Sequence, residues 1–330
     1  MRIFLALLAT LGVALGATAD DAYGEPGPHD IAARPDLVIE DGARDKHLSI
    51  RVTWPEGEGP FPLIVWSHGY LGSKDAYQPL VEHWASHGYV VIQPTHSDSL
   101  SLLPRRDRWA KLREPFTFTG DGGLSDWRNR PRDIVLILDS LDWIEGEVPD
   151  VAGKIDRERI GVGGHSFGAF TTQLIAGVRT TEPGAEASES HADGRVDAAL
   201  MISPQGRDTL LADGAWDTLT GPAMVITGTH DRGRNREPGT WRKEPYDLAP
   251  EGDKYLVWIE GAYHSMGGIT GHEGYTRWSG GLHPEQVLWI QMASRAFWDA
   301  YLKTDPGARA YLDSDALETV SEGIVELSSK

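Results

Sequence analysis

The sequence contains no cysteine among its 330 residues. This absence excludes disulfide bonds, a thiolate nucleophile and cysteine metal ligands. It also excludes a lipid anchor on an N-terminal cysteine. The fold must therefore be stabilised by packing rather than by cross-links.

Positive charge is scarce. The chain has 31 Lys and Arg against 49 Asp and Glu, a formal net charge of −18. An acidic surface repels phosphate backbones, so we expect no nucleic-acid partner, and it slows encounter with anionic substrates. Overall charge therefore favours neutral substrates.

The sequence also lacks an apolar run of the roughly 20 residues that a membrane-spanning helix needs. A shorter run, from Ile3 to Gly16, follows Arg2 and precedes Ala17-Thr18-Ala19. A basic start, an apolar middle and a small-x-small site are typical of a secretory signal peptide. We predict a signal peptide over 1–19 and a periplasmic or secreted protein without a membrane anchor after cleavage.

Short apolar runs alternate with helical stretches from residue 35 onward, a pattern typical of a mostly parallel sheet with helices on both faces. We predict one α/β domain over 35–330, after a flexible arm over 20–34 that is rich in Pro and Gly. The expected strands are 35–39, 47–54, 63–66, 89–93, 160–163, 198–202, 223–227 and 255–259, and the expected helices are 75–87, 131–144, 166–178 and 283–302.

Two segments, 97–130 and 180–194, fit no regular pattern and are predicted to be insertions. Insertions after strands often lie over a site and shape substrate choice. A simple surface excursion is the alternative for both.

The motif Gly164-His165-Ser166-Phe167-Gly168 follows an apolar strand and opens a predicted helix. In that context G-x-S-x-G is typical of a nucleophile elbow, a sharp turn that presents a serine hydroxyl. The strained turn needs small residues two before and two after the serine, as Gly164 and Gly168 are. We predict Ser166 as the nucleophile; the alternative is a tight turn without chemistry.

A serine nucleophile needs a histidine base and an acid, which in this arrangement follow the serine on loops after later strands. Asp231 follows the strand ending at residue 227, and His264 follows the strand ending at 259. We predict these two as acid and base. Alternatives that stay open are Asp208 and Asp247 for the acid, and His230, His272 and His283 for the base.

Acyl transfer also needs hydrogen-bond donors for the developing oxyanion. The backbone N–H groups of Phe167, directly after the nucleophile, and of Tyr70, in Ser67-His68-Gly69-Tyr70, are the predicted pair. We expect His68 to brace that loop, and Asp98 to cap a loop rather than act in catalysis.

His83 and His87 lie four residues apart but lack the H-E-x-x-H pattern of a zinc site. We predict that they lie on a helix surface, and that the protein needs no metal or other cofactor.

Several motifs together resemble a known superfamily. They are Ser67-His68-Gly69-Tyr70, Ser86-His87-Gly88-Tyr89-Val90-Val91, Ile155-Asp156-Arg157 with Arg159-Ile160, and Gly164-His165-Ser166-Phe167-Gly168-Ala169. From about Pro35 to Lys303 the chain resembles the dienelactone hydrolase-like and platelet-activating-factor acetylhydrolase-like α/β-hydrolases. Bacterial cutinase-like polyester hydrolases are similar in pattern.

The resemblance implies the α/β-hydrolase fold and a Ser-Asp-His carboxylesterase, with these roles on Ser166, Asp231 and His264 and the oxyanion hole at Tyr70 and Phe167. The chain differs from these families in its nucleophile. Dienelactone hydrolases use a cysteine, which this chain lacks, so their substrate is not implied.

Substrate contacts are expected at three residues. Similar polyester hydrolases carry a tryptophan after the strand that follows the nucleophile, whereas this chain has Pro204-Gln205 there. Gln205 is therefore the predicted contact, and the polyester interpretation is weakened. Trp109 and Trp127, in the first insertion, are predicted to contact an acyl or aromatic group.

The sequence thus predicts an exported serine esterase that cleaves a small or polymeric carboxylic ester through an acyl-enzyme. A polyester hydrolase or a peptidase on the same fold is the alternative within this class. A non-catalytic binding protein on a hydrolase scaffold is the alternative of another class. Acyl and alcohol specificity and oligomeric state stay open.

Overall fold

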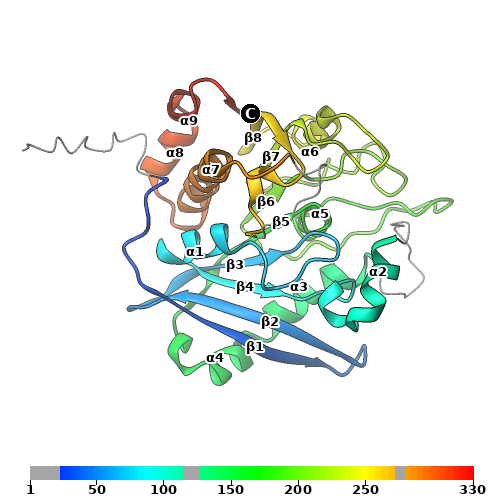
Figure 1. Ribbon diagram of the computed structural model, residues 1–330, viewed down its shortest axis with the longest axis vertical. Helices are drawn as coiled ribbons and strands as arrows, with labels where there is room; N and C mark the ends of the chain where they lie inside the picture. Colours follow the sequence, from blue (N-terminus) through cyan, green and yellow to red (C-terminus); the bar gives the residue numbers. More distant parts are fainter. Residues whose placement is uncertain (1–22, 114–125, 272–279) are drawn as a thin grey trace, which may run out of the picture.

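The computed structural model describes residues 23–113, 126–271 and 280–330, and its centre is one nine-stranded sheet in the order β1-β2-β4-β3-β5-β6-β7-β8-β9 (Figure 1). Neighbours from β4 to β8 are parallel, whereas β1, β2 and β9 pair antiparallel. The predicted mostly parallel sheet is confirmed. The strands are β1 (Ile31–Asp41), β2 (Lys46–Pro55), β3 (Phe61–Ser67), β4 (Val90–Pro94), β5 (Ile155–His165), β6 (Ala198–Ile202), β7 (Ala223–His230), β8 (Lys254–Tyr263) and β9 (Val325–Ser329).

Helices cover both faces of the sheet, which is why the central strands are apolar at every position. On β3, Ile64 and Trp66 point into a cluster with α1 (Gln78–Ser86) and α7 (Pro284–Leu302). Leu63 and Val65 point to the other face, toward α3 (Asn129–Asp139). Figure 1 shows these helices on opposite sides of the strands.

Some elements differ from the sequence-based expectation. The helix predicted over 131–144 is two helices, because Ser140 leaves helical geometry between α3 and α4 (Leu141–Glu147). The elements α2, α6, α8, α9 and β9 were not predicted. The remaining helices are α2 (Arg105–Arg113), α5 (Phe167–Ile175), α6 (Glu244–Leu248), α8 (Pro306–Leu312) and α9 (Ala316–Val320), with 3-10 turns at Leu100–Leu102, Pro149–Val151, Gly239–Lys243 and Met266–Gly268.

A cluster of indoles fills the core on the α1 and α7 face. The ring centroids of Trp66 and Trp84 are 5.1 Å apart, and those of Trp84 and Trp298 are 6.1 Å apart. Trp66 also packs edge-on against Tyr77 at 5.5 Å. All four side chains are buried, so this cluster ties β3 to both covering helices.

The predicted flexible arm over 20–34 overlaps strand β1, so that prediction is wrong for residues 31–34. Strand β1 begins at Ile31, and the preceding backbone is held by α1. His83 Nε2 lies 3.2 Å from the carbonyl oxygen of Tyr23, and His87 Nε2 lies 2.9 Å from that of Glu25. The two histidines are only 8% and 9% exposed, so placing them on a helix surface was also wrong. The predicted signal peptide, 1–19, lies outside the described residues.

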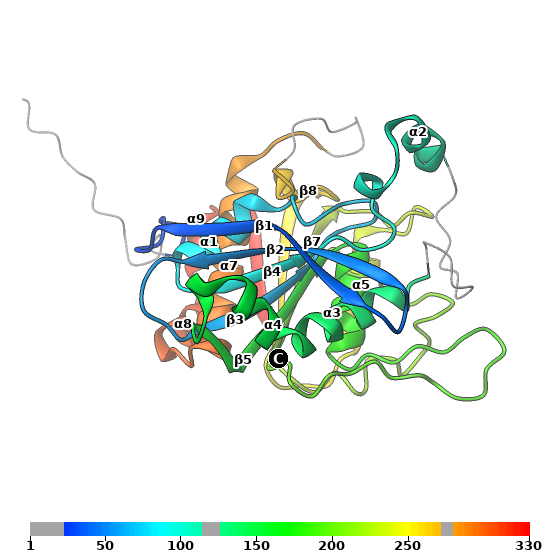
Figure 2. The same ribbon diagram turned by 90° about the horizontal axis from the view of Figure 1, so that it is seen from below.

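The first predicted insertion, 97–130, carries α2, which projects beyond the end of the sheet in Figure 2. Residues 114–125 within it lie outside the described residues. The second, 180–194, contains no helix and is tied by a bridge between Thr180 and Glu189.

Candidate active site

Ser166 occupies a sharp turn between β5 and α5. Its backbone has φ 55° and ψ −115°, a strained geometry for a residue with a side chain. A Cβ atom on Gly164 would lie 2.4 Å from the carbonyl carbon of Gly168, and one on Gly168 would lie 1.9 Å from the carbonyl oxygen of Ser67. Both glycines are therefore required for the turn.

The structure brings the three predicted catalytic residues together. His264 Nε2 lies 2.9 Å from Ser166 Oγ, and His264 Nδ1 lies 2.8 Å from Asp231 Oδ1. Asp231 directly follows β7 and His264 directly follows β8, so parallel strands deliver both side chains to one edge of the sheet. With Nδ1–H donating to Asp231, Nε2 is free of hydrogen and can accept the serine proton.

Asp231 is fully buried and carries more hydrogen bonds than the sequence indicated. Arg242 Nε lies 2.8 Å from Oδ1, while Oδ2 accepts hydrogen bonds from Thr227 Oγ1, at 2.9 Å, and from Ser203 Oγ. Burial alone would raise the pKa of Asp231, but the adjacent Arg242 and His264 lower it below its ordinary value. The carboxylate therefore stays charged and fixes the histidine tautomer.

The alternative acids and bases have other partners, although Asp208 and His230 also line the cleft over Ser166. Asp208 accepts two backbone N–H groups of its own turn, and Asp247 lies in the short helix α6. His230 packs on the ring of Tyr263, and His283 contacts the carbonyl oxygen of Gly280. His272 lies outside the described residues.

The loop after β3 is linked to the loop of His264 through Tyr77 and His165. The Gly69 N–H donates to Tyr77 Oη at 3.0 Å, Tyr77 Oη lies 2.9 Å from His165 Nδ1, and His165 Nε2 lies 2.8 Å from the carbonyl oxygen of His264. A carbonyl only accepts, so Nε2 of His165 carries hydrogen and Nδ1 accepts from the tyrosine. Burial lowers the pKa of His165 to about 3, which keeps the ring neutral.

A cleft of about 1890 Å³ lies over Ser166. The predicted oxyanion residues Tyr70 and Phe167 line it, with ring centroids 6.2 Å apart, and so does Gln205. Gln205 is largely buried, and its Oε1 has no hydrogen-bond partner among the described residues. Although the protein carries a net negative charge, many arginines line the cleft: Arg108, Arg207, Arg232, Arg234, Arg236 and Arg242.

The two predicted tryptophan contacts are not at this cleft. Trp127 is 1% exposed and packs edge-on against Phe170 at 6.0 Å, so predicting it as a substrate contact was wrong: it is a core residue. Trp109 is 71% exposed on α2. Among the described lining residues, α2 contributes Arg108 rather than Trp109.

A second group of buried charges lies beneath the loop after β3. Asp98 pairs with Arg130, with Oδ2 and Nη2 2.8 Å apart, and Asp133 pairs with Lys46 at 2.7 Å. Asp98 also accepts the N–H of Leu71 at 3.1 Å, in keeping with the loop-capping role expected for it. Sequence reasoning missed Arg130, and it missed Arg242 beside Asp231, because these contacts join separate segments and no local pattern marks them.

Within the three described ranges, no group of three or more metal-ligating side chains is found. A search of the same ranges for helices long and apolar enough to cross a membrane also finds none.

The mostly parallel sheet, the helices on both faces and the serine turn between β5 and α5 define the α/β-hydrolase fold. A family model described as Chlorophyllase matches residues 37–107, a segment of 71 of the 330 residues. The match indicates a hydrolase on this fold. The segment includes Tyr70 but not Ser166, Asp231 or His264. A search of the curated proteins finds no match.

Proposed function

We propose that the protein is a serine esterase that hydrolyses carboxylic esters through Ser166, His264 and Asp231. The observation that carries the proposal is the pair of hydrogen bonds, 2.9 and 2.8 Å long, that connects the serine, the histidine and the buried aspartate. The Chlorophyllase match gives independent support, since chlorophyllases are ester hydrolases.

In the first half-reaction, His264 Nε2 takes the proton of Ser166 Oγ as the oxygen attacks the ester carbonyl carbon. The carbonyl electron pair moves onto its oxygen, where the N–H groups of Tyr70 and Phe167 stabilise the negative charge. The tetrahedral intermediate then breaks its bond to the alcohol oxygen. The alcohol leaves with the proton from His264, and the acyl group stays on Ser166.

In the second half-reaction, water attacks the acyl carbon while His264 accepts its proton. The bond to Ser166 Oγ breaks, the serine regains the proton, and the acid is released. Throughout, Asp231 holds the histidine tautomer and stabilises the imidazolium. No metal or other cofactor takes part in this scheme.

The substrate is a small or polymeric ester, and the chlorophyll-type ester named by the matched family belongs in the test panel. Peptidase and polyester hydrolase activities on the same triad are the alternatives. A non-catalytic binding role is the alternative outside the enzyme class.

Export is a further part of the proposal. The basic start, apolar run and Ala17-Thr18-Ala19 support cleavage after Ala19 and delivery to the periplasm or the medium. N-terminal sequencing of protein recovered from a secreting host should begin at Asp20. A first residue of Met1 in that fraction would contradict cleavage.

The test is the initial rate of hydrolysis of p-nitrophenyl esters from acetate to palmitate by the mature protein. We expect activity that Ser166→Ala reduces by at least about 1000-fold, because the acyl-enzyme cannot form. Ser328→Ala, on the distant strand β9, is the matched control and should retain the wild-type rate. A folded wild-type protein that is inert on every ester, and unlabelled by a serine-reactive phosphonate, would refute the proposal.

A further inference from the structure

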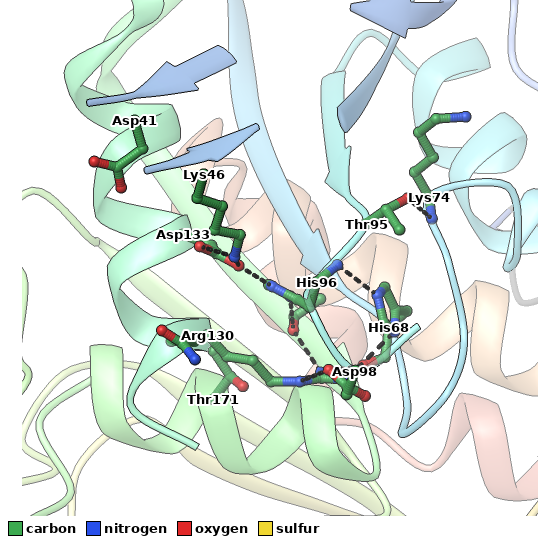
Figure 3. A network of polar contacts seen from close by, with 12 residues as sticks. Asp41, Lys46, His68, Lys74, Thr95, His96, Asp98, Arg130, Asp133 and Thr171 are labelled. Carbon is green, nitrogen blue, oxygen red and sulfur yellow. Dashed lines mark hydrogen bonds and ion pairs between the residues drawn. The ribbon is translucent and has the colours of Figure 1, made fainter. Parts of the chain in front are cut away.

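The guanidinium of Arg130 is buried against the loop after β3, close to His68 and Asp98 (Figure 3). The same loop continues to Tyr70. Arg130 is the second residue of α3 and forms a two-point ion pair with Asp98, with Nε to Oδ1 at 3.0 Å and Nη2 to Oδ2 at 2.8 Å. Asp98 is buried as well. Burial would raise its pKa, but the charge and hydrogen bonds of Arg130 together with the neighbouring histidines lower it to about 2. Both partners are therefore charged and fixed in place.

The other donors of Arg130 bond to the backbone of this loop. Nη1 donates to the carbonyl oxygen of His68 at 2.5 Å, and Nη2 reaches the carbonyl oxygen of Gly69 at 3.3 Å. The Gly69 carbonyl and the Tyr70 N–H belong to one planar peptide group, in which they point in opposite directions. Holding the carbonyl therefore sets the direction of the N–H.

The side chain of His68 bonds to the same carbonyl. Its Nε2 accepts the backbone N–H of His96 at 3.0 Å, so Nδ1 carries the hydrogen and donates to the Gly69 oxygen at 2.6 Å. Burial, followed by the charge of Arg130, lowers the pKa of His68 to about 4. The ring is therefore neutral at neutral pH, and the tautomer assigned from its contacts is the stable one.

The backbone N–H of Gly72 also donates to this oxygen, at 3.0 Å, so three donors meet on one carbonyl oxygen. Together they change the properties of the peptide group as well as its orientation. They draw electron density toward the oxygen, which makes the N–H on the opposite side a stronger donor, and the effect is larger in a water-free interior. The guanidinium carbon also lies 4.2 Å from the centre of the Phe167 ring, so the cation lies close to both predicted oxyanion residues.

We infer that Arg130 and His68 are positioning residues that orient and polarise the Gly69–Tyr70 peptide as an oxyanion donor. The inference rests on the proposed esterase function. It predicts that these side chains act on the transition state rather than on substrate binding, because the oxyanion forms only after attack.

The test compares Arg130→Met and Arg130→Ala with the wild type on one p-nitrophenyl ester, with rates normalised to the folded fraction. We expect kcat to fall about 10- to 100-fold with KM changed less than about twofold, because lost donor strength weakens only the transition state. Affinity for an alkylboronic acid, which forms a tetrahedral adduct with Ser166, should fall in parallel. Methylguanidinium should restore part of the kcat of Arg130→Ala.

His68 provides a second route if the Arg130 variants do not fold. His68→Leu should lower kcat with KM retained, and His68→Asn, whose amide N–H can replace Nδ1–H, should keep more of the rate. Lys46→Gln is the matched control, because Lys46 bonds to Asp133 at the outer end of the same network without touching the loop. It should lower the melting temperature and leave kcat unchanged.

Wild-type kcat and boronate affinity in folded Arg130→Met, or in folded His68→Leu, would overturn the inference while leaving the esterase proposal intact. A loss in kcat for Lys46→Gln as large as that for the Arg130 variants would also overturn it. The buried ion pairs would then support activity only by stabilising the fold. An inactive wild type would instead refute the proposed function itself.

Discussion

The hydroxyl of Tyr77 joins two parts of the site that are far apart in the sequence. It accepts the N–H of Gly69 and donates to His165, which in turn holds the backbone of His264. One buried oxygen thus couples the loop of Tyr70 to the loop of the base. None of this was predicted, because a tyrosine in a helix-entry segment gives no sign in sequence of what its hydroxyl contacts.

Tyr77→Phe should lower kcat by about 10- to 100-fold, because displacement of reacting groups by a fraction of an ångström is costly. It should also lower the free energy of unfolding by about 1–3 kcal/mol, since Gly69 and His165 lose a buried partner. Initial rates and urea unfolding measure the two effects.

Tyr89→Phe is the control for this change. Tyr89 is equally buried and donates to Asp299 at 2.7 Å, away from the cleft. It should lose stability to a similar degree while retaining kcat. Equal kcat losses in the two variants would show that Tyr77 acts through stability alone.

At the scale of elements, the turn from β5 to α5 depends on close backbone approach. Gly168→Ala would place a methyl group 1.9 Å from the Ser67 carbonyl oxygen, so the helix or β3 must move. We expect a loss of about 1–3 kcal/mol in unfolding free energy, and loss of most activity as Ser166 shifts. At Gly146 in α4, a Cβ atom would meet no described atom within 4 Å beyond the adjoining backbone of its own helix, so Gly146→Ala should be neutral or stabilising by up to about 1 kcal/mol. Retained activity in Gly168→Ala would contradict this account of the turn.

The sequence predicted the elements that carry the triad because their signals are local. The strands before Ser166, Asp231 and His264 each contain a short apolar run, and in a parallel sheet their carboxyl ends meet at one edge. The chain order of the three residues then follows from the order of the strands.

What the sequence did not predict depends on contacts between distant segments. Trp127 resembled a cleft residue because it lies in an irregular segment, but the helix α5 buries it. The N-terminal segment resembled a loose arm because it is polar and contains Pro26-Gly27-Pro28, yet His83 and His87 bond to its backbone. Such contacts leave no periodicity in either segment.

At the scale of the whole molecule, buried histidines should make stability depend on pH. Burial lowers the pKa of His68 and His87 to about 4, and of His83 and His165 to about 3. In the unfolded chain these rings take up protons near pH 6.5. Between about pH 6.5 and pH 4 the unfolded state therefore binds more protons, and stability falls as the pH falls.

Each such histidine contributes up to about 1.4 kcal/mol per pH unit in that range. The urea midpoint should therefore be clearly lower at pH 5 than at pH 7. The double variant His83→Gln with His87→Gln, far from the cleft, should show a shallower decline. A midpoint that does not change between pH 7 and pH 5 would contradict the prediction, as would an unchanged slope in the double variant.

The indole cluster of Trp66, Trp84 and Trp298 gives the protein a built-in optical probe. Indoles shielded from water emit at shorter wavelengths than exposed ones, and closely packed rings produce strong near-ultraviolet circular dichroism. Trp66 directly precedes Ser67 at the end of β3, and its ring packs against Tyr77. Its signal therefore reports on packing at this end of β3, close to the turn at Ser166. Loosening of that region can therefore be followed by tryptophan fluorescence and near-ultraviolet circular dichroism, without any substrate.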